Sequence, residues 1–213
     1  MGSLKFQRQD TAQSSTASTT KFLLHDSDRY ARYRTLESIS PEIFDIFSNS
    51  RSATASAIAA DTYLISLPIS GYIKSGTSYK IYFTASKTAA GVASPTFVVR
   101  IGTSGTTSDT AVITFNTSLA QTAASDIGRF EIDLTVTNYG ASSIILGTLH
   151  ISHSLLTGGF LSGTNRQTIM QSVNSTAVNL TSSNLLLGLS VNPGASANWT
   201  ILIAHITAIN PGP

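Results

Sequence analysis

The sequence contains no cysteine, which excludes a disulfide framework, a thiolate metal site and a cysteine nucleophile. Charge is also scarce, since 11% of the 213 residues are Asp, Glu, Lys or Arg, against roughly 25% in ordinary soluble domains. The 13 basic and 11 acidic residues leave a net charge of only +2. A nucleic-acid surface needs clustered positive charge, so we expect no nucleic-acid partner. Short hydroxyl and apolar residues replace the charged ones, which suits a surface that packs against neighbours in an assembly.

Long apolar runs are missing as well. Stretches such as Ile144–Leu146 and Leu185–Val191 fall far below the ~18–20 residues of a membrane span. No apolar run follows Met1, so the sequence shows no secretory signal. We therefore expect no membrane partner and no export by a signal peptide.

Charged residues gather near the start of the chain, where residues 1–51 hold 13 of the 24. The segment Thr11–Thr20 is polar and of low complexity, which is typical of an extended arm. This change of composition predicts an N-terminal arm and docking segment over 1–58, followed by a head domain over 59–213.

A basic and aromatic cluster, Arg29-Tyr30-Ala31-Arg32-Tyr33-Arg34, lies within this segment. Arginine contacts to phosphate and tyrosine stacking on bases would suit a nucleic acid. However, Asp26, Asp28 and Glu37 nearly neutralise the cluster. We favour a protein-docking surface with arginine and tyrosine anchors, and a structural role within the chain is the other alternative.

A short helix is predicted next, because Ser40 suits an N-cap and Pro41 suits the first helical position. Its apolar face would consist of Ile43, Phe44 and Phe47, and it would end by Asn49. Such a small helix must dock on something. The candidate docking residues are therefore Arg29, Tyr30, Arg32, Tyr33, Arg34, Ile43, Phe44 and Phe47.

From Asp61 onward the apolar residues alternate with polar ones, which is the pattern of half-buried strands. About nine such segments are separated by Gly, Pro, Asn and Ser turns, with no strong helical stretch among them. The segments begin near Tyr63, Tyr79, Phe97, Ala111, Phe130, Ile144, Ile169, Leu185 and Trp199. The fold class predicted is all-β: an antiparallel, jelly-roll-like β-sandwich preceded by the extended arm with one short helix. The last segment is apolar on both faces, which predicts a central strand or a strand at a subunit interface.

No constellation of catalytic residues emerges. His150 and His153 are three apart in a strand, so they point to opposite faces and cannot bind one ion together. Glu131 and Asp133 share the polar face of a strand and are expected to face solvent, although spacing alone leaves a glycosidase-like acid pair open. The loop Gly102–Thr107 lacks the lysine of a phosphate-binding loop. We expect a protein that is not an enzyme, with no catalytic residues, no cofactor and no metal.

Several stretches of the head resemble one known class of proteins. They are Ala59–Leu64, Lys87–Gly91, Ser94–Phe97, Arg100–Ala111 and, at the end, Gly188–Asn192 with Ala197–Ile201. Together they resemble virion proteins of tailed bacteriophages that have β-sandwich heads, including capsid decoration (cement) proteins, head fibres and tail-fibre-like components. The likeness covers residues 55–210 or so and does not extend to the N-terminal segment.

The resemblance implies a homotrimeric head in the virion, made in the host cytoplasm, with the N-terminal arm bound to another virion protein. Our leading hypothesis is a capsid decoration protein whose arm binds the major capsid protein and stabilises the shell. The alternative is a tail-fibre or tail-spike adaptor, or a receptor-binding protein that contacts host glycans. Exposed loop aromatics would favour this alternative, and Tyr72, Tyr139 and Phe160 are the candidates.

Overall fold

The structure is a computed structural model, and it describes residues 21–25, 31–35, 46–51, 55–88, 91–117, 119–162, 169–195 and 197–209. The chain divides into two compact units, Met1–Ile43 and Phe44–Pro213. Within the first unit, strands β1 (Lys21–His25) and β2 (Ala31–Thr35) form an antiparallel pair. Sequence analysis did not predict this hairpin, because it lies in the segment expected to be extended.

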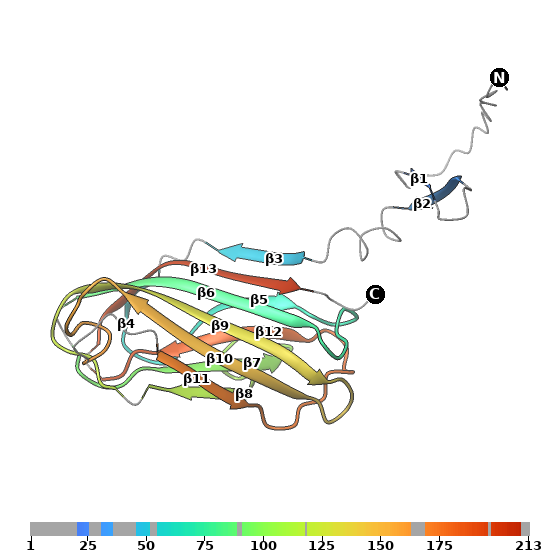
Figure 1. Cartoon of the computed structure of the whole chain (residues 1–213). Coiled ribbons are helices and arrows are strands. Elements are labelled where there is room, and N and C mark those ends of the chain that lie inside the picture. Colours follow the sequence, from blue (N-terminus) through green and yellow to red (C-terminus); the bar gives the residue numbers. More distant parts are fainter. Residues whose placement is uncertain are drawn as a thin grey trace, which may run out of the picture. The chain divides into compact units, whose positions relative to one another are not determined.

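The second unit is built from strands alone in its described part (Figure 1). Nine of these strands lie from Thr62 onward, as the alternating segments predicted. The strands are β3 (Ile46–Arg51), β4 (Ala55–Ile58), β5 (Thr62–Pro68), β6 (Ser78–Lys87), β7 (Thr96–Gly102), β8 (Thr110–Asn116), β9 (Asp126–Asn138), β10 (Ile144–His153), β11 (Ile169–Asn174), β12 (Leu186–Asn192) and β13 (Trp199–Ile209).

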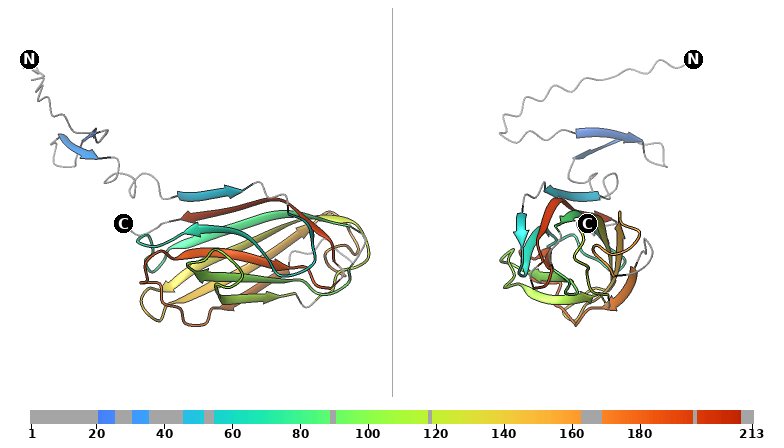
Figure 2. Two further views of the ribbon diagram at one scale, coloured as in Figure 1. Left: turned by 180° about the vertical axis from the view of Figure 1, so that it is seen from behind. Right: turned by 90° about the vertical axis from the view of Figure 1, so that its left-hand side faces the viewer.

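Two sheets face each other across one interior (Figure 2). The larger sheet has seven strands in the order β11-β10-β9-β6-β13-β3, with β4 also paired to β13. The smaller sheet has four strands in the order β5-β12-β7-β8. All of these pairings are antiparallel. The predicted all-β antiparallel sandwich is confirmed.

Alternation along each strand explains which residues reach the interior. In β6 and β9 every second side chain is buried, and the intervening ones face outward on the larger sheet. Strand β12 differs, because five consecutive residues, 187–191, are buried. Strand β12 lies between β5 and β7. The Tyr63 side chain covers Gly188 so closely that a Cβ added to Gly188 would lie 1.8 Å from the Tyr63 hydroxyl oxygen. A strand covered on both faces cannot show the simple alternation.

A β-bulge in β13 accounts for the apolar residues on both of its faces. Trp199 and Ile201 are fully buried, and the pairing with β6 then shifts register between Ile201 and Ile203. Leu202 has no pairing partner in β6, so the alternation of inward and outward side chains shifts by one residue after it. Ala204 is therefore buried, while Leu202 and Ile203 are exposed. β13 is also internal to the larger sheet, between β6 and the pair β3 and β4. The predicted central strand is therefore confirmed, and the bulge explains its pattern.

The expected helix ending by Asn49 is wrong where the structure describes it, because Ile46–Arg51 is strand β3. Its backbone pairs with β13, from Ile46 opposite Ile209 to Arg51 opposite Ala204. A short helix has few hydrogen bonds of its own, whereas this segment completes an otherwise open edge of the sheet. Residues 36–45, including the predicted helix start, lie outside the described residues. The predicted domain boundary at 58 stays a prediction, and β3 and β4 belong to the sheet of the second unit.

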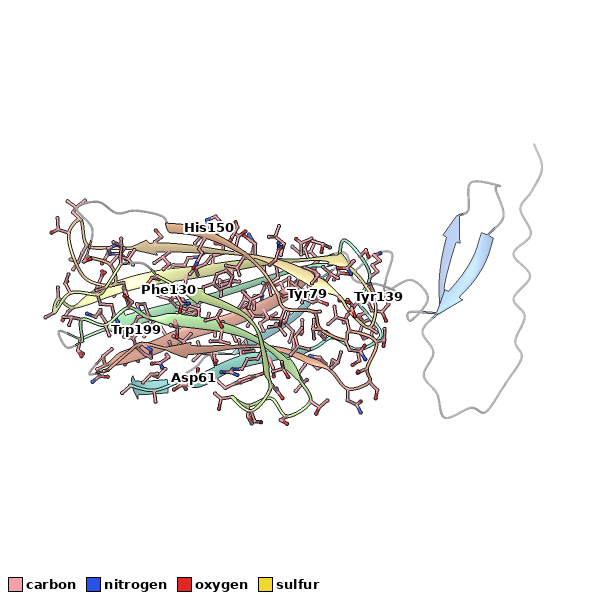
Figure 3. All side chains as sticks on the ribbon, turned by 90° about the horizontal axis from the view of Figure 1, so that it is seen from below. Asp61, Tyr79, Phe130, Tyr139, His150 and Trp199 are labelled. Atoms are coloured by element: carbon pink, nitrogen blue, oxygen red, sulfur yellow. The ribbon has the colours of Figure 1, made fainter. Side chains whose placement is uncertain are left out.

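Aromatic side chains fill the interior at one end of the sandwich. Phe83 and Phe130 stack with ring centres 4.6 Å apart, and Phe160 meets Trp199 edge-on at 4.8 Å. Trp199 and Phe130 lie within the body of the sandwich in Figure 3. The Trp199 Nε1–H donates to Oε1 of buried Gln121 at 2.8 Å, which satisfies the polar end of the indole.

Candidate functional site

The predicted docking residues are divided among different parts of the chain. Arg32, Tyr33 and Arg34 lie together on β2, where the backbone pairs them with residues 22–24 of β1. Phe47 belongs to β3, opposite Ala208 of β13. The remaining four, Arg29, Tyr30, Ile43 and Phe44, lie outside the described residues. Docking through these residues stays a prediction.

One group of charges in the sandwich serves the fold. The Arg100 guanidinium donates to Ser190 Oγ at 2.8 Å, to the Asp109 carbonyl at 2.9 Å and to Asp61 Oδ2 at 2.6 Å. The Asp109 carboxylate accepts the backbone N–H groups of residues 104 and 105 at 3.0 and 2.8 Å. These contacts hold the outer side of the smaller sheet and the loop between β7 and β8, so they give no reason to expect a ligand there.

Asp126 is the second structural charge, and its side chain is fully buried with that of His153. Its Oδ2 accepts from His153 Nδ1 at 2.8 Å and from the Phe160 N–H at 3.1 Å. Its Oδ1 accepts from Ser154 Oγ at 2.9 Å and from the Leu155 N–H at 3.2 Å. Burial alone would raise the pKa of Asp126, but the hydrogen bonds from Phe160, Ser154 and His153 outweigh it and hold the pKa below its usual value. The carboxylate thus fastens the loop that follows β10.

Lys87 completes the structural group. Its Nζ donates to the carbonyl oxygens of Gly91 and Thr122. Burial lowers the pKa of Lys87, and the nearby Asp126 carboxylate opposes this shift. The ammonium therefore holds two loops together at the same end of the sandwich as Asp126.

A different group of polar side chains lies on the outer face of the larger sheet. The backbone register places them in three rows that cross β13, β6, β9 and β10. The middle row is His205, Tyr82, Glu131 and His150. The row on one side of it is Thr207, Lys80, Asp133 and Thr148. The row on the other side is Ile203, Thr84, Arg129 and Ser152. We call these three rows the outer polar face.

Ion pairs link the charges of the outer polar face. Lys80 Nζ lies 2.6 Å from Glu131 Oε1 and 3.5 Å from Asp133 Oδ1. Arg129 lies 3.5 Å from the other Glu131 oxygen. The hydrogen bond between Lys80 and Glu131 raises the pKa of the ammonium and lowers the pKa of the carboxyl. Both groups therefore remain charged over a wide pH range.

Aromatic rings occupy one side of the same face. The Tyr82 ring lies 5.1 Å from the imidazole of His205, and the Arg129 guanidinium lies 5.0 Å from the Tyr82 ring centre. His150 Nε2 lies 3.8 Å from Asp133 Oδ2, which is too long for a hydrogen bond. His150 and Asp133 thus keep hydrogen-bonding capacity toward solvent.

A shallow hollow of about 260 Å³ opens between β9 and β10 on this face. Its lining consists of Arg129, Glu131, Asp133, His150 and Ser152. Sequence analysis predicted that Glu131 and Asp133 share the solvent-facing side of one strand, and the partly exposed carboxylates bear this out. The sequence did not predict that Lys80 of β6 and His150 and Ser152 of β10 would lie beside these carboxylates. The only feature of the sequence that indicated this was the alternation of polar and apolar positions in all three strands.

The histidines and loop aromatics have distinct outcomes. His150 faces outward (Figure 3). His153 is buried, so the prediction of opposite faces is confirmed. Tyr72 and Tyr139 are exposed, as a glycan-contacting role would require. Phe160 is fully buried against the aromatic core, so its predicted place among exposed loop aromatics is wrong.

Among the residues that the structure describes, no three His, Asp or Glu side chains come close enough together to hold a metal ion. The same residues include no helix that is long and apolar enough to span a membrane.

Comparison with known proteins places the fold in a broad setting. No family model and no curated protein matches the sequence. Among solved structures, a lectin from Bauhinia forficata in complex with GalNAc has 11% identity and a TM-score of 0.37, and the match covers 78% of this chain and 93% of the lectin. The lectin UEA-II complexed with galactose has the same identity and coverage at a TM-score of 0.36. The structure of infectious bursal disease virus, Gx strain, has 17% identity and a TM-score of 0.25, with 79% of this chain and 43% of the viral chain covered. The all-β sandwich rests on the chain's own strands and their pairing, and matches this distant carry no argument about function.

Proposed function

We propose that the protein is a virion structural protein of the capsid decoration type, which binds the shell through its N-terminal segment. The observation that carries this proposal is the division of the chain between Ile43 and Phe44 into a small unit and a large β-sandwich. The small unit contains most of the predicted docking residues, including Arg32, Tyr33 and Arg34 on β2. An attachment module joined to a rigid head is the arrangement that a decoration protein requires.

The chemistry of the sandwich supports a structural role. Most of its buried charges hold loops and strands together, as Arg100 and Asp126 do. On the outer face, hydroxyl pairs bridge neighbouring strands, such as Ser78 with Thr135 and Thr148 with Ser172, each at 3.1 Å. Such a head resists local opening. A homotrimer of heads would bring three attachment segments to the shell together, which strengthens weak single contacts through effective concentration.

Deletion of residues 1–43 tests this proposal. The structure places the cut before β3, because removal of β3 would uncover the edge of β13 and expose it to strand pairing with other copies. The truncated chain should fold with an unchanged Tm and fail to co-sediment with capsids assembled from the major capsid protein of the same virus. The full-length R32A/R34A variant should bind weakly, while the matched variant K74A should bind normally. Full capsid binding by the truncated chain would overturn the proposal.

The tail-fibre or receptor-binding alternative makes a different prediction about abundance. Shell decoration requires hundreds of copies in each virion, whereas a tail component is present in only a few. Quantitative mass spectrometry of purified virions, with the major capsid protein as the internal standard, separates the two. Light scattering of the pure chain tests the proposed homotrimer, which should have three times the 22.4 kDa chain mass.

A further inference from the structure

The outer polar face stands apart because the fold does not require its charges. Lys80, Glu131, Asp133 and Arg129 lie on the outward positions of β6 and β9, opposite the buried residues that form the core. Asp133 is about half exposed and Arg129 more so, with 44% and 59% of their side chains accessible. Exposed ion pairs contribute little to stability, roughly 0–1 kcal/mol each. The chain has few charged residues, so stability alone does not explain why four of them lie together on the outer polar face.

The charges at this place are balanced. Two cations, Lys80 and Arg129, lie within ion-pair distance of two carboxylates, Glu131 and Asp133. An anionic ligand would meet the carboxylates, and a cationic ligand would meet the ammonium and guanidinium groups. An apolar ligand would remove these groups from water without replacing their hydrogen bonds, which is costly. The face therefore suits a ligand that is neutral and rich in hydrogen-bonding groups.

The hollow offers both donors and acceptors at close range. The carboxylates accept hydrogen bonds, Arg129 donates them, and the Ser152 hydroxyl does both. A hydroxyl group likewise donates one hydrogen bond and accepts others, so a row of hydroxyls matches this mixture better than a peptide or a single ion does. The volume of the hollow, about 260 Å³, is slightly below the range of sites for drug-sized ligands, roughly 300–1,000 Å³, which suits a single ring-sized unit.

We propose that the outer polar face binds a neutral saccharide, with one sugar unit in the hollow between β9 and β10. The hydroxyls of the sugar would hydrogen-bond to Glu131, Asp133 and Arg129, and the His150 ring would contact its edge. The row continues through Tyr82 to His205 on β13, which would let a second unit of a longer glycan lie across the sheet. This site does not depend on where the protein is located in a virion, and it differs from the loop tyrosines Tyr72 and Tyr139.

The test is a titration of the full-length chain with neutral methyl glycosides of galactose, glucose, mannose and N-acetylglucosamine and their disaccharides. Saturation-transfer NMR and calorimetry should show saturable binding of at least one of them. Each of the variants E131Q and D133N should weaken binding about tenfold or more, because one carboxylate acceptor becomes a donor and the remaining amide oxygen is a weaker, uncharged acceptor. Because the ligand is neutral, affinity should change little between low and high salt.

Matched controls make the outcomes distinct. Y72A and Y139A should bind as the unaltered chain does, and Trp199 fluorescence should confirm that all variants are folded. The proposal is wrong if no glycoside binds, or if binding is lost in Y72A or Y139A and retained in E131Q and D133N. It is also wrong if E131Q and D133N reduce the oligomeric mass, because the face would then be an interface between copies. None of these results depends on capsid binding, so the failure of either proposal leaves the other standing.

Discussion

Replacement of Asp126 by alanine is the sharpest test of how the loop after β10 is held. The carboxylate accepts hydrogen bonds from the side chains of His153 and Ser154 and from the backbone N–H groups of residues 127, 155 and 160. Alanine removes the acceptor of all of these hydrogen bonds from a site that is closed to water. The Phe160 N–H and the His153 ring would then be buried without their partner.

The expected loss can be worked from these contacts. A buried donor left without a partner costs roughly 1–3 kcal/mol, and in D126A both the Phe160 N–H and the His153 ring lose their acceptor. The free energy of unfolding of D126A should therefore fall by about 3–5 kcal/mol, a large part of the roughly 5–15 kcal/mol typical of a domain. Release of the loop would also draw Phe160 away from Trp199, which it meets edge-on.

Urea unfolding followed by tryptophan fluorescence measures this loss, because Trp199 is the chain's single tryptophan and is fully buried. The matched control is D133N, which alters a half-exposed carboxylate on the outer polar face and should change stability by less than about 1 kcal/mol. A loss below about 1 kcal/mol in D126A would refute the reasoning, because the five hydrogen bonds to the carboxylate would then contribute no more than an exposed ion pair.

The pH dependence of the same variant has a defined sign. The folded-state pKa of Asp126 lies below its usual value of 3.8. Stabilisation by a carboxyl with a lowered pKa is complete above the unfolded value and disappears as the pH falls through the folded value. The difference in stability between the unaltered chain and D126A should therefore shrink as the pH falls below about 3.8. A difference that grew on acidification would contradict the assignment.

Three further variants probe the core. F160A should lose about 3–5 kcal/mol of unfolding free energy in urea denaturation, whereas Y139A, which removes an exposed ring, should stay within about 0.5 kcal/mol. Q121A should lose about 1–3 kcal/mol and shift the emission of Trp199, because the indole N–H loses its acceptor; an unchanged spectrum would count against that contact. G147A should lower Tm, with a cost of about 1–3 kcal/mol, because a Cβ there would lie 2.9 Å from two side-chain carbons of β8; an unchanged Tm would show that these side chains yield freely.

Much of the sandwich could be predicted because each strand carries its own alternation. The set Phe130, Ile132, Leu134 and Val136 is apolar in the sequence and buried in the structure. Alternation reports only on the strand that carries it, however. In β8 the pairing with β7 shifts register next to Arg100, so that Val112 is buried beside Ile113 while Ala111, two positions before Ile113, is exposed. Bulges of this kind depend on the partner strand and leave no local pattern.

Two errors have a common physical cause, which is that distant contacts outweigh local tendencies. The segment Ile46–Arg51 pairs with β13, more than 150 positions later in the chain, and this pairing decides its structure. Phe160 lies in a loop that appears exposed in the sequence. The positive φ values of Gly158 and Gly159, 81° and 83°, turn the chain there, and Asp126 then holds the Phe160 N–H at 3.1 Å. A pair of glycines directly before an apolar pair was the only local signal of this inward turn.

The outer polar face shows why a binding surface on a sheet is harder to predict than its core. Any amphipathic strand has a polar side, so Glu131 or Lys80 alone indicates nothing beyond exposure. The rows arise only when the register is known, and a slip of one residue would turn each side chain to the other face. In this sheet the core sets the register, because Phe83 pairs with Phe130 and stacks on it at 4.6 Å. The next position along the same two strands places Tyr82 opposite Glu131. The buried stack of Phe83 on Phe130 therefore sets the positions of Tyr82 and Glu131 in the middle row of the outer polar face. A substitution that loosens this stack should disturb the proposed saccharide site even though the substituted residue does not contact the saccharide.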